Sequence, residues 1–117
     1  MRDHTKLKAF ELADELAILI YKATNRFPKH EIYGLTSQLR RAAISVPSNI
    51  VEGCARESQA EYVRFLEIAF GSLRELHYQC SLSVRLGYIE YDFSPIESKI
   101  QETEKVLGAL IRSMRKC

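Results

Sequence analysis

Residues 34–56 constrain this chain more than any other stretch, because helical spacing runs through them on both sides of a proline. Apolar or small residues recur mostly three and four positions apart and so share one helix face: Leu35, Leu39, Ala42, Ala43, Val46, Ile50 and Cys54. Pro47 interrupts that pattern without ending it. A proline in a helix interior removes one backbone donor and costs about 3 kcal/mol. The stretch therefore predicts a kinked helix that the surrounding fold supports.

Pro47 leaves the carbonyl of Ala43 without the amide that an ordinary helix residue would donate to it. Nearby short polar side chains could supply a replacement, and Asn49 is one of them. Two interpretations of the kink stay open. It either bends the helix around its own core or shapes a surface beside Arg40 and Arg41.

Three more stretches carry apolar residues at helical spacing, and residues that favour helix ends separate them. Pro28 closes the first stretch, because the residue before a proline disfavours a helix. Ser58 and Glu61 form a capping box at the start of the third, and Gly87 suits a left-handed cap at its end. Ser94, followed by a proline, caps the start of the fourth. The predicted helices cover about residues 5–26, 34–56, 58–86 and 94–114.

Four helices with short links predict an all-α protein, an antiparallel up-down-up-down four-helix bundle with a proline-kinked second helix. A chain of 117 residues suits one bundle of this kind, so we expect a single domain over residues 1–117. The chain is 46% hydrophobic and 27% charged, which is ordinary for a globular protein and argues against disorder.

The residues that usually carry catalysis or bind metals are few and scattered. His4, His30 and His77 share no metal-ligand spacing. Cys54 and Cys80 lie on apolar helix faces, where a buried thiol acts as a small hydrophobe. No nucleophile with a base, no paired acids and no phosphate-binding loop can be recognised. We therefore expect no enzyme activity, no small-molecule substrate, no metal and no cofactor.

No stretch of the sequence points to a membrane or to secretion. The first residues lead into an amphipathic helix rather than an apolar signal region, and no apolar run reaches the roughly 20 residues of a membrane span. The three cysteines are odd in number and far apart, which does not indicate a disulfide framework. These features predict a cytoplasmic protein without a membrane partner.

The third predicted helix carries a second apolar stripe, roughly opposite the stripe that faces the core. Apolar residues on the first helix, outside its own core stripe, extend this surface. A surface of that length is unusual on a monomer and usually marks an interface. We therefore expect homo-oligomerisation through Ile68, Gly71, Tyr78, Leu82 and Leu86, together with Leu12 and Leu19. The alternative is that a compact bundle buries more of the third helix than two faces suggest.

Five basic residues are candidates for contact with nucleic acid: Arg26, Lys29, Arg40, Arg41 and Arg56. The net charge of +2 is too small to indicate RNA binding, but an oligomer would repeat each basic group once per subunit. The alternatives are that Arg40 braces the bundle and that the other arginines are solvated or salt-bridged. Four aromatic residues near the helix ends could stack on unpaired bases or plug the ends of the bundle: Tyr33, Tyr88, Tyr91 and Phe93.

A longer pattern resembles the signature of a bacterial family. It consists of residues 33–43 (YGLTSQLRRAA), 45–50 (SVPSNI), Glu52-Gly53, 65–69 (FLEIA), 71–76 (GSLREL) and 86–88 (LGY). The chain resembles the four-helix bundle proteins first noticed as reading frames inside 23S rRNA intervening sequences, sometimes labelled as ribosomal proteins. The resemblance implies an antiparallel four-helix bundle and, in relatives, a ring-shaped pentamer. In a more distant branch, the accessory proteins of diversity-generating retroelements, a basic surface engages RNA and a reverse transcriptase.

Two functions of different classes follow from these observations. The first is a non-catalytic homo-oligomer, pentameric as in relatives, that binds structured RNA or a nucleic-acid enzyme through a repeated basic surface. The second is a protein-interaction scaffold that does not bind nucleic acid. The resemblance to retroelement proteins favours the first, and the near-zero net charge favours the second.

Overall fold

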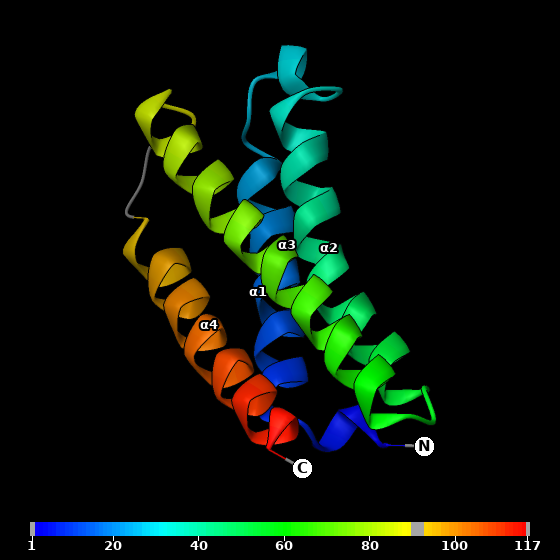
Figure 1. Ribbon diagram of the computed structural model, residues 1–117. Coiled ribbons are helices and arrows are strands. Elements are labelled where there is room, and N and C mark those ends of the chain that lie inside the picture. The colour runs from blue at the N-terminus through cyan, green and yellow to red at the C-terminus, as the bar shows by residue number, and fades with distance from the viewer. Residues whose placement is uncertain (1, 90–92, 117) are drawn as a thin grey trace.

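Four helices form the molecule, and the computed structural model describes residues 2–89 and 93–116 of the chain. The helices are α1 (Lys8–Thr24), α2 (Leu35–Cys54), α3 (Gln59–Arg85) and α4 (Ser94–Arg115), and short 3₁₀ turns at His4–Lys6 and Lys29–Glu31 precede α1 and α2. Each helix runs against the one before it, so α1 begins and α4 ends at the same end of the molecule (Figure 1). Both α1 and α3 contact α2 and α4. The predicted antiparallel up-down-up-down four-helix bundle is confirmed.

Helix α1 turns a wide face into the bundle. Its buried side chains follow a repeat of three and four residues: Ala9, Leu12, Ala13, Leu16, Ile20, Ala23 and Thr24. Leu12 is only 1% exposed, so its prediction as a surface residue of an oligomer interface was wrong. The reason is that α1 packs against both α2 and α4, which widens its buried stripe beyond what one neighbour would require. Leu19, also predicted for that surface, is half-buried.

Helix α2 continues through Pro47, as predicted, and Pro47 itself is buried. Asn49 donates a hydrogen bond at 2.8 Å to the carbonyl of Ser45, rather than to that of Ala43. Ala43 lies six residues back, nearly two helical turns away, whereas Ser45 is one turn away. Asn49 also donates to the Ser45 hydroxyl at 2.9 Å, and that hydroxyl pairs at 2.8 Å with the hydroxyl of Ser72 on α3. The polar residues near the proline thus connect α2 to α3.

The buried stripes of α3 and α4 complete the core. In α3 it comprises Tyr62, Leu66, Ala69, Leu73, Leu76, Gln79, Cys80 and Ser83, and in α4 it comprises Ile96, Ile100, Thr103, Leu107 and Ile111. The helical repeat of α3, continued to the end of the helix, predicts an inward Val84, but Val84 is 40% exposed and Ser83 is buried beside it. Burial of Ser83 is tolerated because its hydroxyl donates to the carbonyl of Gln79 at 2.8 Å.

The residues predicted to cap the two ends of α3 do so in the structure, whereas the cap at the start of α4 lies one residue before the predicted one. The Ser58 hydroxyl accepts from the amide of Glu61 at 3.1 Å, which confirms that side of the capping box. Gly87 has φ 78°, and the amide of Tyr88 bonds to the carbonyl of Ser83, as in a Schellman cap. Phe93, not Ser94, is the N-cap residue of α4, and its carbonyl accepts hydrogen bonds from the amides of Ile96 and Glu97.

Candidate interaction surfaces

The five basic residues predicted to contact nucleic acid do not form one surface on a single subunit. Arg26 and Lys29 lie where α1 turns back into α2, and Arg40 reaches back to the end of α1. Arg41 points to α3, while Arg56 follows the far end of α2. Since a helix rises about 1.5 Å per residue, Arg41 and Arg56 are separated by roughly 20 Å along α2.

Arg40 braces α1 against α2, which was one of the two roles predicted for it. Its Nε donates at 2.8 Å to the Thr24 hydroxyl, and one terminal nitrogen donates at 3.0 Å to the Asn25 side chain. Its guanidinium carbon also lies 4.8 Å from the centre of the Tyr21 ring. These contacts engage Nε and one of the two terminal nitrogens, and they hold the guanidinium against the end of α1.

Arg41 and Arg56 are each paired with a carboxylate. Arg41 donates at 2.8 Å to Glu75 on α3, and Arg56 donates at 2.9 Å to Glu52 one turn earlier. The Arg56 guanidinium also lies over the ring of Phe65. Both ion pairs remain half-exposed, where such pairs contribute about 0–1 kcal/mol to stability. An RNA phosphate would therefore compete with an existing partner at either arginine.

The turn between α1 and α2 combines basic and exposed aromatic side chains. Tyr33 is 96% exposed and Ile32 is 54% exposed, and both directly follow the 3₁₀ turn that contains Lys29. Lys29 and Arg26 are themselves exposed. In the sequence, Tyr33 and these cations were separate candidates. The sequence could not place Tyr33 in solvent beside the cations, because a helical repeat does not show whether an aromatic residue outside it is exposed.

Glu31 holds this turn in shape from within. One carboxylate oxygen accepts from the Leu35 amide at 3.0 Å and so caps α2, while the other accepts from the Tyr88 hydroxyl at 2.7 Å. The hydrogen bond from the Leu35 amide, followed by that from Tyr88, lowers the pKa of Glu31 below its ordinary value. Lys29 and Tyr33 therefore flank a residue that is anchored at both oxygens.

The aromatic residues near the helix ends divide between the two roles predicted for them. Tyr88 and Phe93 pack against the core, and the Tyr88 ring lies 5.5 Å from that of Phe27. They act as plugs at the end of the bundle. Tyr33 instead faces solvent. Tyr91 lies outside the described residues.

The outer face of α3 carries the apolar residues predicted for self-association. Tyr78 is 61% exposed, Leu86 50% and Ile68 41%, whereas Leu82 is half-buried. A side chain added at Gly71 would meet no atom within 4 Å, so the helix surface there is open. We name Ile68, Gly71, Tyr78, Leu82 and Leu86 the α3 face.

A second group of exposed apolar residues lies across α1 and α2, and the sequence patterns did not predict it. Ile18 is 51% exposed, Tyr21 38% and Ile44 44%. Arg40 of α2 lies over the ring of Tyr21 of α1. The two helices are antiparallel, so one turn forward on α2 corresponds to one turn back on α1. Ile44 therefore lies beside the turn of α1 that contains Ile18. A depression of about 400 Å³ on α1 is lined by Ala17, Ile18, Tyr21, Lys22 and Asn25. The sequence did contain a signal for this exposed group, because Ile18 on α1 and Ile44 on α2 both lie outside the core stripes of their helices.

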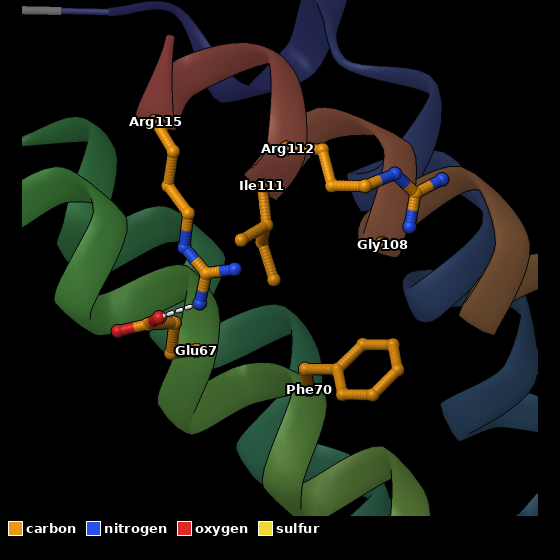
Figure 2. Close-up of a pocket in the computed structure, with 6 residues that line it drawn as sticks. All are labelled: Glu67, Phe70, Gly108, Ile111, Arg112 and Arg115. Atoms are coloured by element: carbon orange, nitrogen blue, oxygen red, sulfur yellow. Dashed lines mark hydrogen bonds and ion pairs between the residues drawn. The ribbon is translucent and has the colours of Figure 1, made fainter.

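An open cleft separates α3 and α4 near the end of α4. It has a volume of about 380 Å³ and is lined by Glu67, Phe70, Gly108, Ile111, Arg112 and Arg115. Figure 2 shows the Phe70 ring and the Arg112 side chain on either side of Gly108, while Arg115 extends to form an ion pair with Glu67. The sequence patterns did not predict this cleft. Gly108 was a possible signal, because a glycine inside a helix leaves space beside the backbone.

The described residues offer no evident centre for catalysis. No three His, Cys, Asp or Glu side chains among residues 2–89 and 93–116 gather as a metal site requires. Burial raises the pKa of the Cys80 thiol to about 12, and it also raises the pKa of Cys54, which opposes formation of a reactive thiolate. None of the described helices is long and apolar enough to cross a membrane.

Comparison with known proteins agrees with this architecture. A crystal structure from Bacteroides thetaiotaomicron, described as a protein with unknown function from the S23 ribosomal protein family, is similar with a TM-score of 0.80 at 24% identity. The match covers 89% of this chain and 95% of that one, and at this identity it shows the fold alone. A comparison with curated proteins gives no significant match. The model of the 23S rRNA-intervening sequence protein family matches residues 5–109, and the chain therefore belongs to that family.

Proposed function

We propose that this protein is a cytoplasmic, non-catalytic binding protein that assembles with copies of itself and contacts structured RNA at the turn between α1 and α2. The observation that carries the proposal is the 96% exposure of Tyr33 beside the exposed cations Lys29 and Arg26. Aromatic rings that face solvent beside cations suit RNA, because a ring can stack on an unpaired base while the cations neutralise phosphates.

Self-assembly would concentrate this weak local charge. One subunit carries a net charge of only +2, but a homo-oligomer repeats Lys29, Arg26 and Tyr33 once per subunit. Each phosphate that is neutralised releases counterions, so several repeated contacts add to the affinity and to its salt dependence. The α3 face supplies the apolar area that self-association needs.

Fluorescence anisotropy with a structured rRNA fragment tests the RNA contact. The double change Lys29→Gln with Tyr33→Ala should weaken binding at least tenfold, since a stacked base contributes about 1–3 kcal/mol. The slope of log affinity against log salt should also become shallower by about 0.7–0.9 for each phosphate that the variant no longer neutralises.

The matched control changes the two arginines that already have carboxylate partners, Arg41→Gln with Arg56→Gln. This variant removes two positive charges per subunit, whereas the Lys29 and Tyr33 variant removes one, yet it should bind RNA nearly as well as the wild type. Loss of binding in the control, with binding retained in the Lys29 and Tyr33 variant, would move the RNA site away from the turn.

Sedimentation velocity tests self-association. Tyr78→Glu places a charge on the exposed α3 face and should lower the native mass while the helical content is unchanged. Ile44→Glu is the control, because Ile44 is similarly exposed but lies on α2. A mass that falls only in the control would place the interface on the second apolar group.

A protein-interaction scaffold is the second candidate, and a specific observation favours it. Arg40, Arg41 and Arg56, which were predicted to contact RNA, are engaged within the subunit. An assembled protein that does not bind the RNA at about 50 mM salt would support the scaffold over the RNA-binding function.

A further inference from the structure

The cleft between α3 and α4 has the composition of a ligand site that the proposed function does not use. It lies near the end of α4, opposite the turn that carries Tyr33 (Figure 1). Its volume of about 380 Å³ falls within the range of small-ligand pockets, about 300–1,000 Å³. Apolar walls from Phe70 and Ile111 face two guanidinium groups and one carboxylate (Figure 2).

Gly108 keeps this cleft open, although packing does not demand a glycine there. A glycine inside a helix destabilises it by about 0.5–1 kcal/mol relative to alanine. A Cβ at Gly108 would lie 3.4 Å from a terminal nitrogen of Arg112 and 3.6 Å from the Phe70 ring, which are ordinary contacts. The position tolerates a side chain, but a larger side chain would fill the space between the guanidinium and the ring.

The two arginines of the cleft differ in what they bind. Arg115 forms an ion pair with Glu67 across the cleft. Arg112, one turn earlier on α4, has no carboxylate partner among residues 2–89 and 93–116. Two guanidinium groups and one carboxylate give the lining a formal charge of +1, which matches a ligand with a single negative charge. A dianionic phosphate would be less well matched, because Glu67 would repel it.

We propose that this cleft binds a small aromatic acid, a ligand with one flat ring and one carboxylate. The ring lies against Phe70 and Ile111, where aromatic contacts favour offset or edge-on packing. The carboxylate accepts two parallel hydrogen bonds from the planar guanidinium of Arg112. Gly108 lets the ring approach the backbone of α4 between these two groups.

Titration of isotope-labelled protein, followed by NMR, tests the site with benzoate as the probe. Benzoate should shift the Gly108 amide and the Phe70 ring signals in a saturable manner. Acetate carries the charge without the ring, and benzyl alcohol carries the ring without the charge. Each should bind at least about fivefold more weakly than benzoate, because each lacks one half of the recognition.

Three variants separate a built site from general surface binding. Arg112→Gln should weaken benzoate binding about tenfold, and Arg112→Lys should retain only part of the affinity because a lysine lacks the planar fork. Gly108→Leu should abolish binding by filling the cleft, with Ala109→Leu at an exposed position of the same helix, outside the cleft lining, as its control. Lys105→Gln removes an exposed cation from the same helix and should leave binding unchanged. Should Gly108→Leu not fold, the Arg112 variants still decide the question.

Non-saturable shifts, equal binding of acetate and benzoate, or unchanged benzoate binding by Arg112→Gln would each overturn the proposal. The inference does not depend on RNA binding, because Lys29 and Tyr33 lie at the other end of the bundle. A protein that fails to bind RNA could therefore still bind benzoate, and the reverse also holds.

Discussion

Helix α3 packs against α2 on one side and α4 on the other, and the two seams are built differently. Along α2, small residues bring the helices close together. A Cβ at Gly53 would lie 2.9 Å from the Cβ of Phe65, so no side chain fits without movement. The hydroxyls of Ser45 and Ser72 meet at 2.8 Å in the same seam. This seam leaves no room for a ligand.

The exposed pair of Arg41 and Glu75 also crosses the α2–α3 seam, but along α4 the ion pairs involve two carboxylates and an open space remains. Glu104, whose side chain is 13% exposed, accepts from Arg74 at 2.8 Å and lies 3.0 Å from His77. Arg115 pairs with Glu67 further along, where the cleft at Gly108 begins. Close packing of small residues favours stability, whereas charged contacts between separated helices leave space that another molecule can enter. The α2–α3 seam is therefore the closely packed one, and the α3–α4 seam is the one that contains an open cleft.

The largest effect should follow from filling the close seam. Gly53→Val should lower the free energy of unfolding by about 3 kcal/mol, because the Phe65 side chain and the backbone of α2 must both shift. Urea unfolding measures this change. The control is Ala109→Val at an exposed position of α4, which should lower the free energy of unfolding by less than about 1 kcal/mol. Equal stabilities of the two variants would contradict the difference between the seams.

A smaller effect is expected at the charged seam. Glu104→Gln should lower the free energy of unfolding by about 1 kcal/mol, since it weakens hydrogen bonds to a charged group that is largely buried. Glu102 is exposed on the same helix, and Glu102→Gln should change stability by less than about 0.5 kcal/mol. A loss at Glu104 larger than that at Gly53 would mean that charge, rather than close packing, dominates the stability of α3.

Glu31 belongs to neither seam, and its contribution should depend on pH. Its folded-state pKa is lowered, so the unfolded chain takes up a proton first and stability is lost as pH falls below about 5. The wild type should have a higher Tm than Glu31→Gln at pH 7, and the difference should shrink in acid. Circular dichroism melts at pH 7 and pH 3.5 measure both values. A difference that stays constant with pH would exclude the carboxylate charge as its source.

The smallest effect should come from the exposed ion pair at the cleft. Arg115→Gln should change the free energy of unfolding by less than about 0.5 kcal/mol, because both Arg115 and Glu67 are about half-exposed. The urea midpoint reports this change. A loss above about 1 kcal/mol would show that Arg115 holds α4 against α3. The residues at the cleft would then serve stability.

Helical spacing predicted the elements well because it is a local property of the chain. The inner face of α2 and the capping box at Ser58 were both recognised from residues within a few turns of one another. Leu12 and Val84 were assigned to the wrong side, since their burial depends on how many neighbours surround α1 and where α3 ends. The one-residue displacement at Ser94 reflects which carbonyl accepts the first amides of α4.

Four amphipathic helices, their order and the similarity to a family could all be derived from the sequence, because periodicity, caps and motifs involve neighbouring residues. The engagement of Arg40, the exposure of Tyr33 and the position of Arg112 beside a cleft became known from the folded structure. Those features depend on the register between helices that are far apart in sequence. One residue of rotation or a few ångströms of translation changes which side chains meet, and helical spacing alone does not encode that register.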